Sequence, residues 1–162
     1  MFFLAAQRAS VLAIVDGLTE DQLRRTTVPS GWTPAGIIEH LGDAERVWFQ
    51  HVVAGEPTDA DLEPVDIERA DGTVSDGFRP RRSVAETLPY YRAQTVRSDE
   101  ILAATPLDAR PAARPVVDIG IADYEMTVRD VVLHLIEETA RHAGHLDLAR
   151  ELIDGRTGLG PR

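Results

Sequence analysis

The feature of this sequence that most constrains its fold is a long helical pattern near the end of the chain, between Thr127 and Gly155. Apolar residues recur in it every three or four positions, which is the spacing of one face of an α-helix. Thr127 stands where an N-cap is expected, and Gly155 stands where a C-cap is expected. The pattern predicts one long helix with an apolar stripe that faces the rest of the protein.

Three earlier segments show the same period, and we predict helices over residues 2–16, 34–54 and 84–104. The second has the clearest start, because a threonine that can act as N-cap is followed by a proline at the first helical position. The third begins with the capping-box pattern Ser-x-x-Glu and contains Pro89, which we expect to disturb its early turns. A capping box at Thr19 predicts a further short helical turn.

Two long connections, residues 56–82 and 105–126, separate these helices and are rich in proline, glycine and aspartate. The best strand signal of the chain, PVVDIGI at residues 115–121, lies in the second connection, and we interpret it as loop. Because long loops in compact domains often cover a site, we expect the first connection to contribute to the mouth of one. Residues 1–162 are therefore predicted to form a single all-α domain, a four-helix bundle with long crossover loops.

The last predicted helix carries polar residues on and beside its apolar stripe. At about 100° per residue, His142 falls within the stripe, Glu138 lies about 40° to one side of it, and His145 lies about 20° further. Glu137 points well away, so we expect Glu138 to face the bundle and Glu137 to face solvent. An ionised carboxylate beside an apolar stripe is costly unless a cation or a hydrogen-bond donor meets it. The stripe consists of Val128, Leu135, Thr139, Leu146, Ala149 and Ile153.

The second predicted helix offers a matching histidine, His40, which also lies in an apolar stripe. Glu138 and His142 are four residues apart and can chelate one ion, and His40 from a facing helix could complete a His2Glu set with open coordination positions. A buried hydrogen bond between glutamate and histidine, without any metal, explains the spacing equally well. His51 is too far along its helix to share the ion, and we interpret His134 as a neighbour of the site or a solvated residue.

The composition excludes several kinds of chemistry. The chain has no cysteine, so a disulfide, a thiolate ligand and a cysteine nucleophile are excluded. All 17 basic residues are arginine, which also excludes a Schiff-base lysine and a P-loop lysine. The formal net charge of -10 argues against nucleic acid and anionic membranes as partners. Since no apolar run is long enough to span a membrane and MFFLAA lacks the pattern of a signal peptide, we expect a cytoplasmic protein that acts on a small-molecule substrate.

Two stretches of the sequence resemble a known family. VPSGWTPAGIIEHLGDAERVWFQHVVAGE and MTVRDVVLHLIEETARHAGHLDLARELIDG are similar to the DinB/YfiT-like superfamily of metalloenzymes, in particular to the branch related to mycothiol-dependent maleylpyruvate isomerase. The similarity also includes AAQRASVLAIVDGLTEDQL, so it covers most of the chain outside the two connections. Its specific part is a tryptophan before a helix with His-Leu, together with Glu-x-x-x-His in the last helix.

The resemblance implies a four-helix bundle in up-down-down-up order, often a homodimer, with a divalent ion held by His40, Glu138 and His142. Histidine and carboxylate ligands suit zinc and nickel, among other metals. Many DinB-like relatives have a histidine in place of Glu138, whereas the glutamate is typical of the mycothiol branch. The C-terminal domain of the isomerase has no counterpart in the sequence, so the specific reaction of that enzyme is not carried over.

The resemblance also implies thiol chemistry, in which a low-molecular-weight thiol such as mycothiol acts as nucleophile in S-transfer or in a thiol-assisted isomerisation. An external thiol would suit a protein that has no cysteine of its own. His145, close to the ion but outside its ligand set, would then be the catalytic residue that moves a proton or orients a ligand. Two alternatives remain, a metal-dependent hydrolase and a non-catalytic, metal-stabilised bundle that binds a small molecule.

Overall fold

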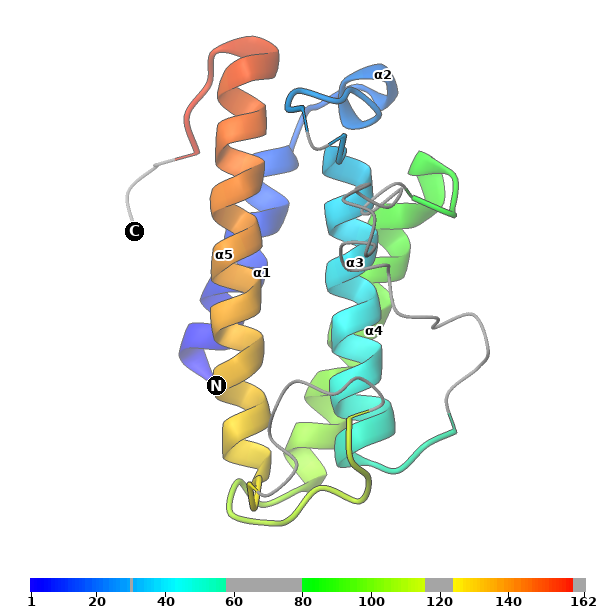
Figure 1. The fold of residues 1–162 in the computed structure, drawn as a ribbon, viewed down its shortest axis with the longest axis vertical. Coiled ribbons are helices and arrows are strands. Elements are labelled where there is room, and N and C mark those ends of the chain that lie inside the picture. The colour runs from blue at the N-terminus through cyan, green and yellow to red at the C-terminus, as the bar shows by residue number, and fades with distance from the viewer. Residues whose placement is uncertain (30, 58–79, 116–123, 159–162) are drawn as a thin grey trace.

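The computed structural model describes residues 1–29, 31–57, 80–115 and 124–158, and these residues form helices and no strands (Figure 1). The predicted all-α class is therefore confirmed. None of the helices in the described ranges is long and apolar enough to cross a membrane. The elements are α1 (Phe2–Val15), α2 (Glu20–Leu23), α3 (Pro34–Glu45), the π-helix η1 (Arg46–Val53), α4 (Val84–Ala104) and α5 (Val128–Asp154).

The helix starts lie where the sequence places them, because local hydrogen bonds satisfy the first backbone N–H groups. The Thr33 hydroxyl accepts a hydrogen bond from the Gly36 N–H at 3.1 Å, directly before the proline that opens α3. Thr19, Ser83 and Thr127 each form a capping box, with reciprocal bonds to the residue three positions on. Pro89 lies inside α4 and does not end it, and the expected disturbance of the early turns stays a prediction.

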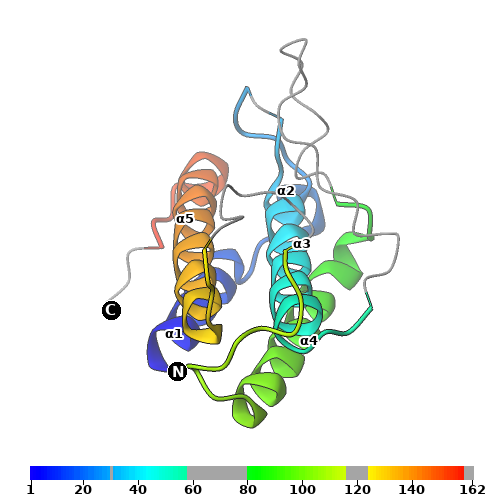
Figure 2. The ribbon, with the colours of Figure 1, turned by 60° about the horizontal axis from the view of Figure 1, so that its bottom comes forward.

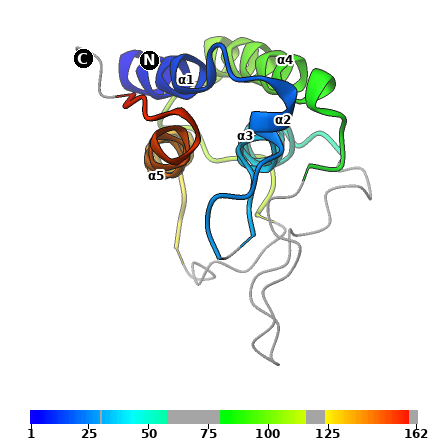
Figure 3. The same ribbon diagram turned by 90° about the horizontal axis from the view of Figure 1, so that it is seen from above.

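The four long helices run up, down, down and up, as the resemblance implied. In Figure 1, α1 and α5 rise side by side, whereas α3 and α4 descend on the other side of the bundle. Seen from above, α1 and α4 form one layer, and α5 and α3 form the other (Figure 3). The closest packing is between α1 and α5 and between α3 and α4, so α3 faces α5 across a lighter contact.

The second predicted helix differs from expectation in its final turns. The sequence predicts one regular helix to about residue 54, but the chain winds as a π-helix over Arg46–Val53. The bond from the Ala54 N–H to the Phe49 carbonyl, at 3.0 Å, spans five residues instead of four. Such a turn holds more residues than an α-helical turn, so each residue rotates the chain by less than about 100°. Side chains beyond Glu45 therefore point in directions that a regular helix would not give them.

The buried apolar residues form two clusters, one near α2 and one near η1. Each long helix also contributes polar side chains at the level between the two clusters. Arg8 of α1, Glu45 of α3, Ser98 of α4 and His142 of α5 are buried, and Glu138 of α5 is half-buried. We call these five residues the polar layer. The first cluster contains Val11, Ile14, Val15, Leu23, Ala35, Ile37, Ile38, Leu41, Val84, Tyr91, Ala143 and Leu146. The second contains Leu4, Trp48, Phe49, Val52, Val53, Ile101, Val128, Val131, Val132 and Leu135.

Arginine–carboxylate pairs tie the start of α4 to α3. Arg82 donates from Nη1 to Glu39 Oε1 at 2.8 Å, and Arg81 donates from Nη2 to Asp43 Oδ2 at 2.5 Å. Glu39 is 3% exposed, and both Arg81 and Arg82 donate hydrogen bonds to its carboxylate. The next residue, His40, points to the opposite neighbour, α5. One side of α3 is thus fixed by charge pairs, whereas the other side presents an imidazole.

The second connection runs along the chain from α4 to α5 (Figure 2). Its described part forms backbone hydrogen bonds with the end of η1 and with the start of α5. The Ala113 N–H donates to the Val52 carbonyl at 3.0 Å, and the Arg129 N–H donates to the Leu107 carbonyl at 2.8 Å. These bonds close the bottom of the bundle in Figure 1. Most of the connection over residues 56–82, predicted to cover a site, lies outside the described residues, as does nearly all of the strand signal at residues 115–121.

Candidate metal centre

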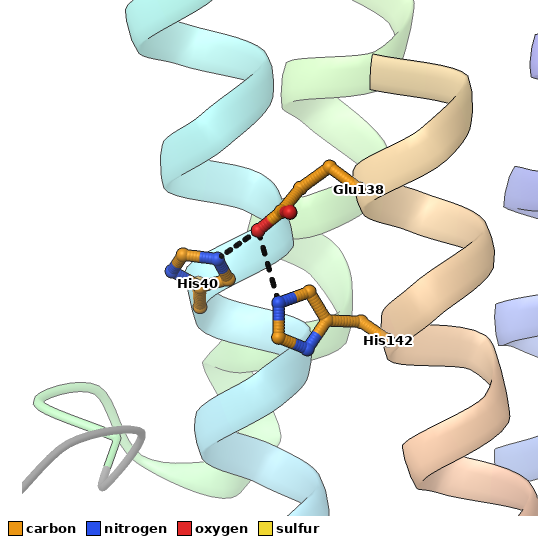
Figure 4. A group of neighbouring side chains, drawn as sticks. All are labelled: His40, Glu138 and His142. Carbon is orange, nitrogen blue, oxygen red and sulfur yellow. Dashed lines mark hydrogen bonds and ion pairs between the residues drawn. The ribbon is translucent and has the colours of Figure 1, made fainter. Parts of the chain in front are cut away.

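Three side chains from two helices meet between α3 and α5. His40 extends from α3, while Glu138 and His142 extend from α5 (Figure 4). His40 Nε2 lies 2.9 Å from Glu138 Oε1, and His142 Nε2 lies 3.0 Å from the same oxygen. The sequence singled out these three residues from helical phase, and the structure brings their donor atoms together.

The positions of these residues follow from the two apolar stripes. Glu138 and His142 are one turn apart on α5, so their side chains reach the same point. His142 is only 4% exposed, because it occupies a stripe position on α5. The side chains of His40 and Glu138 are 23% and 20% exposed. The group is therefore buried on the α5 side and open to solvent on another.

The carboxylate of Glu138 is held in its charged form. Hydrogen bonds from His142 and then His40 lower its pKa well below the usual range for a glutamate, against the opposing effect of burial. Within the described parts of the chain, no arginine forms an ion pair with Glu138. The site is thus a carboxylate anion bracketed by two imidazole rings, whose centroids lie 4.9 Å apart.

This donor set fits a divalent cation. One ligand atom from each of the three residues lies within 4.8 Å of the others. Bonds of about 2.0–2.2 Å in a tetrahedral arrangement place ligand atoms roughly 3.3–3.6 Å apart. Glu138 Oε1 lies slightly closer than this to each histidine nitrogen, at 2.9 and 3.0 Å, so the three side chains can open around an ion by rotating about their side-chain bonds. Two imidazole nitrogens and one carboxylate oxygen are the donors of many catalytic zinc sites, in which a further position is open. The geometry therefore meets the requirements of a three-residue metal centre.

His145 is not one of the three residues of the candidate metal centre, but it contacts one of them, His142. Its Nδ1 is 3.3 Å from Nδ1 of His142, the ring nitrogen that does not contact Glu138. Burial, and then the nearby His142 and Arg141, lower the pKa of His145, so the ring is neutral at neutral pH. The Trp32 ring packs against it with a centroid distance of 5.9 Å. His145 is thus placed to act on the site through His142.

His134 departs most from the sequence interpretation, which left it as a neighbour of the site or a solvated residue. It is half-buried, and its ring lies 4.4 Å from the ring of Trp48 in η1. The sequence did not predict this contact, because it did not predict the π-helical turns of η1 from which Trp48 extends. One signal in the sequence could have placed His134 on the same face of α5 as the site: His134 and Glu138 are four residues apart on one helix.

The residues predicted to lie elsewhere do so. Glu137 is exposed, whereas the adjacent Glu138 faces the bundle. His51 Nδ1 lies 2.9 Å from the Glu56 carbonyl, at the end of η1, and His51 is not part of the metal centre. The contrast between neighbouring glutamates confirms the phase argument on which the site rests.

Comparison with known proteins supplies one match. The family model described as Mycothiol-S-transferase matches residues 1–155, which is nearly the whole chain. Neither the search of curated proteins nor the search of solved structures found a match. The matched range includes α3 and α5, and therefore all three residues of the candidate metal centre.

Proposed function

The chain belongs to the Mycothiol-S-transferase family, and on that premise we propose that it transfers a low-molecular-weight thiol such as mycothiol to an electrophile, with a divalent ion held by His40, Glu138 and His142. The observation that carries this proposal is the convergence of two imidazole nitrogens on one ionised carboxylate oxygen, at 2.9 and 3.0 Å. We propose zinc or nickel as the metal, because both accept this mixture of nitrogen and oxygen donors.

A bound divalent ion would supply the positive charge that keeps a thiol deprotonated at neutral pH. The chain itself contains no cysteine, so a thiol nucleophile has to come from a second molecule. Glu138 contributes the negative charge that attracts the ion, and burial of His142 fixes one ligand direction before the ion arrives. The protein thereby positions the reactants but does not enter the reaction covalently.

His145 has a separate part in this proposal. When Nε2 of His142 is a ligand, its Nδ1 carries the proton and donates to Nδ1 of His145. This bond fixes the tautomer and the orientation of the His142 ring. The other nitrogen of His145 then carries a proton and can pass it to or from a reacting group nearby.

The test is metal analysis of the purified protein combined with titration by mycothiol. One ion per chain is expected, and thiol binding is expected to release about one proton per site near neutral pH, because the thiol binds as thiolate. Removing the ion with a chelator should abolish both the proton release and the thiol transfer. Proton release that persists without metal contradicts the proposal. Metal-dependent turnover without any thiol would identify a hydrolase, and metal-dependent stability without turnover would identify a binding protein.

We further propose that the active unit is a homodimer joined through α1. Arg8 is the only charged residue of α1, and it is buried, so the exposed face of this helix is uncharged. Phe2 and Phe3, at the start of that face, are 80% and 69% exposed. Two copies that each carry a net charge of -10 can approach most easily through a surface without charge. Light scattering should show a dimer at micromolar concentration, and Ala9→Glu should convert it to monomer.

A further inference from the structure

His134 is the one histidine of α5 that the proposed mechanism does not use. Its ring contacts Trp48 at a centroid distance of 4.4 Å, and no residue in the described ranges forms a hydrogen bond with its ring nitrogens. His134 is half-buried, and its ring nitrogens are not among the buried polar atoms that lack a partner. Here the nitrogens remain available to a molecule from outside the protein.

The π-helix explains why His134 has this tryptophan beside it. Trp48 follows His40 by eight residues, which in a regular α-helix would turn it about 80° away from the direction of His40. Val47 would then face α5 instead. The wider turns of η1 rotate less per residue, and they bring Trp48 back over α5, where it is 8% exposed while Val47 is only half-buried. π-Helical turns are frequent at functional sites, and this one holds His134 in place.

The environment of His134 keeps the ring neutral. Burial lowers the pKa of His134, and the negative charges of Glu138 and Glu137 only partly oppose this effect. A neutral imidazole has one N–H donor and one acceptor nitrogen. It can therefore donate to an uncharged oxygen without placing a second cation beside the metal centre.

The distance of His134 from the metal centre suits a substrate that spans both. His134 and Glu138 are four residues apart on α5, so they are separated by a rise of about 6 Å along the helix axis. The carbonyl oxygen of a conjugated enone lies at the far end of the conjugated system from the carbon that a thiolate attacks. One side chain can thus hold that oxygen while the sulfur approaches from the neighbouring site.

We propose that His134 is the acceptor-binding residue of the thiol transfer, and that the acceptor class is an uncharged electrophile whose reacting carbon is conjugated to a carbonyl group. This inference rests on the proposed function. Trp48 is a positioning residue, because it acts through its contact with the His134 ring.

The step balances without any further reactant. The thiol gives up its proton and its sulfur lone pair forms a bond to the β-carbon, while the carbon–carbon π bond breaks. The electrons of that π bond move through the conjugated system to the carbonyl oxygen. There the N–H of His134 donates a hydrogen bond to the developing negative charge. The carbonyl re-forms as a proton returns to the α-carbon. The net reaction adds sulfur and hydrogen across the double bond.

The test compares two acceptors in the metal-loaded enzyme with mycothiol as thiol. One acceptor is 4-phenylbut-3-en-2-one, which has the conjugated carbonyl, and the other is benzyl chloride, which has no oxygen. His134→Phe keeps a ring against Trp48 but removes the donor, and it is expected to lower kcat/KM for the enone about a hundredfold with little change for the chloride. His134→Gln retains an N–H donor and is expected to restore part of the loss. His51→Phe, at the end of η1, serves as the matched control.

A binding measurement separates this inference from the proposed function. Trp48 is the sole tryptophan left in a Trp32→Phe background, so its fluorescence reports on this end of the site. The unreactive ketone 4-phenylbutan-2-one should quench it, and His134→Phe should weaken that binding about fivefold. Equal loss of both acceptors in His134→Phe, or no loss of either, overturns the inference. Ketone binding that depends on His134, in an enzyme that transfers no thiol, overturns the proposed function alone.

Discussion

Two carboxylates of the polar layer, Glu45 and Glu138, are withdrawn from water in different ways. Glu45 is 1% exposed and receives both a 2.7 Å bond from Arg8 Nε and a 2.6 Å bond from Arg8 Nη2. Arg8 also pairs with Asp99 at the surface. Glu138 is met by imidazoles from His40 and His142 instead.

The partner determines what each carboxylate can still bind. A guanidinium cancels the charge of Glu45 and occupies both of its oxygens, so the pair is complete as it stands. An imidazole can bind either a carboxylate or a metal ion through the same nitrogen, so the two histidines that contact Glu138 can exchange the carboxylate for an ion. Buried charge therefore marks a candidate site only where its partners are exchangeable.

The largest effect is expected from breaking the complete pair. Arg8→Met leaves the carboxyl group of Glu45 buried without its partner, which should lower the free energy of unfolding by about 3–5 kcal/mol. Urea denaturation followed by circular dichroism measures this loss. The double variant Arg8→Met/Glu45→Met should recover most of it, because no charge then remains buried. A single variant as stable as the parent would show that Glu45 is not sealed from solvent.

Removing the charge of Glu138 should affect metal binding instead of the stability of the fold. Glu138→Gln removes the negative charge but keeps the shape, so the metal-free protein should unfold within about 1 kcal/mol of the parent. Stoichiometric metal binding should be lost, as it should in His40→Ala and His142→Ala. At a metal concentration of a hundred times Kd, the parent gains about 2.7 kcal/mol of stability, and Glu138→Gln should gain none. Glu137→Gln, one residue away and exposed, is the matched control and should bind normally.

A smaller effect on the rate of thiol transfer is expected from changes at His145, which contacts His142. His145→Ala removes the partner of His142 Nδ1, and it should lower thiol-transfer rates about tenfold or more while metal content falls much less. His145→Gln, whose side-chain oxygen can accept the same proton, should recover part of the rate. Metal content and rate that fall in parallel would show that His145 acts on ion binding alone.

The smallest effect concerns pH. Because burial lowers the pKa of His134, the unfolded chain binds the proton first, near the ordinary histidine value of about 6.5. The stability that His134 contributes is thus fully present above that pH and is lost as pH falls below it. The melting temperature of the metal-free protein should drop between pH 7.5 and 5.5, and the drop should be smaller in His134→Phe. An unchanged slope would contradict the burial of this ring.

The sequence could predict the helices and the convergence of His40, Glu138 and His142 because both depend on local rules. Capping patterns at Thr33, Ser83 and Thr127 fix where helices begin, and the period of about 3.6 residues places His142 and Glu138 on the buried face. The contact of His134 with Trp48 could not be predicted this way, because it depends on a π-helical turn that changes the phase.

The pairing of Arg8 with Glu45 was also missed, although one signal for it is present. Arg8 stands four residues after Leu4 and three before Val11, which places an arginine on the apolar face of α1. A charged residue at such a position needs a partner, but the sequence does not say which of 27 acidic residues supplies it. That choice depends on how α1 lies against α3 and α4, which is a property of the assembled bundle.

The polar layer also limits how the helices can slide along one another. Apolar stripes alone tolerate a shift of one helical turn, about 5.4 Å, since leucine, valine and isoleucine replace one another with little loss. Such a shift of α1 would move Arg8 away from Glu45 and set a guanidinium against apolar side chains. A shift of α5 would likewise separate Glu138 from His40. The polar layer therefore fixes the register of the helices, and this register is the one that brings His40, Glu138 and His142 together.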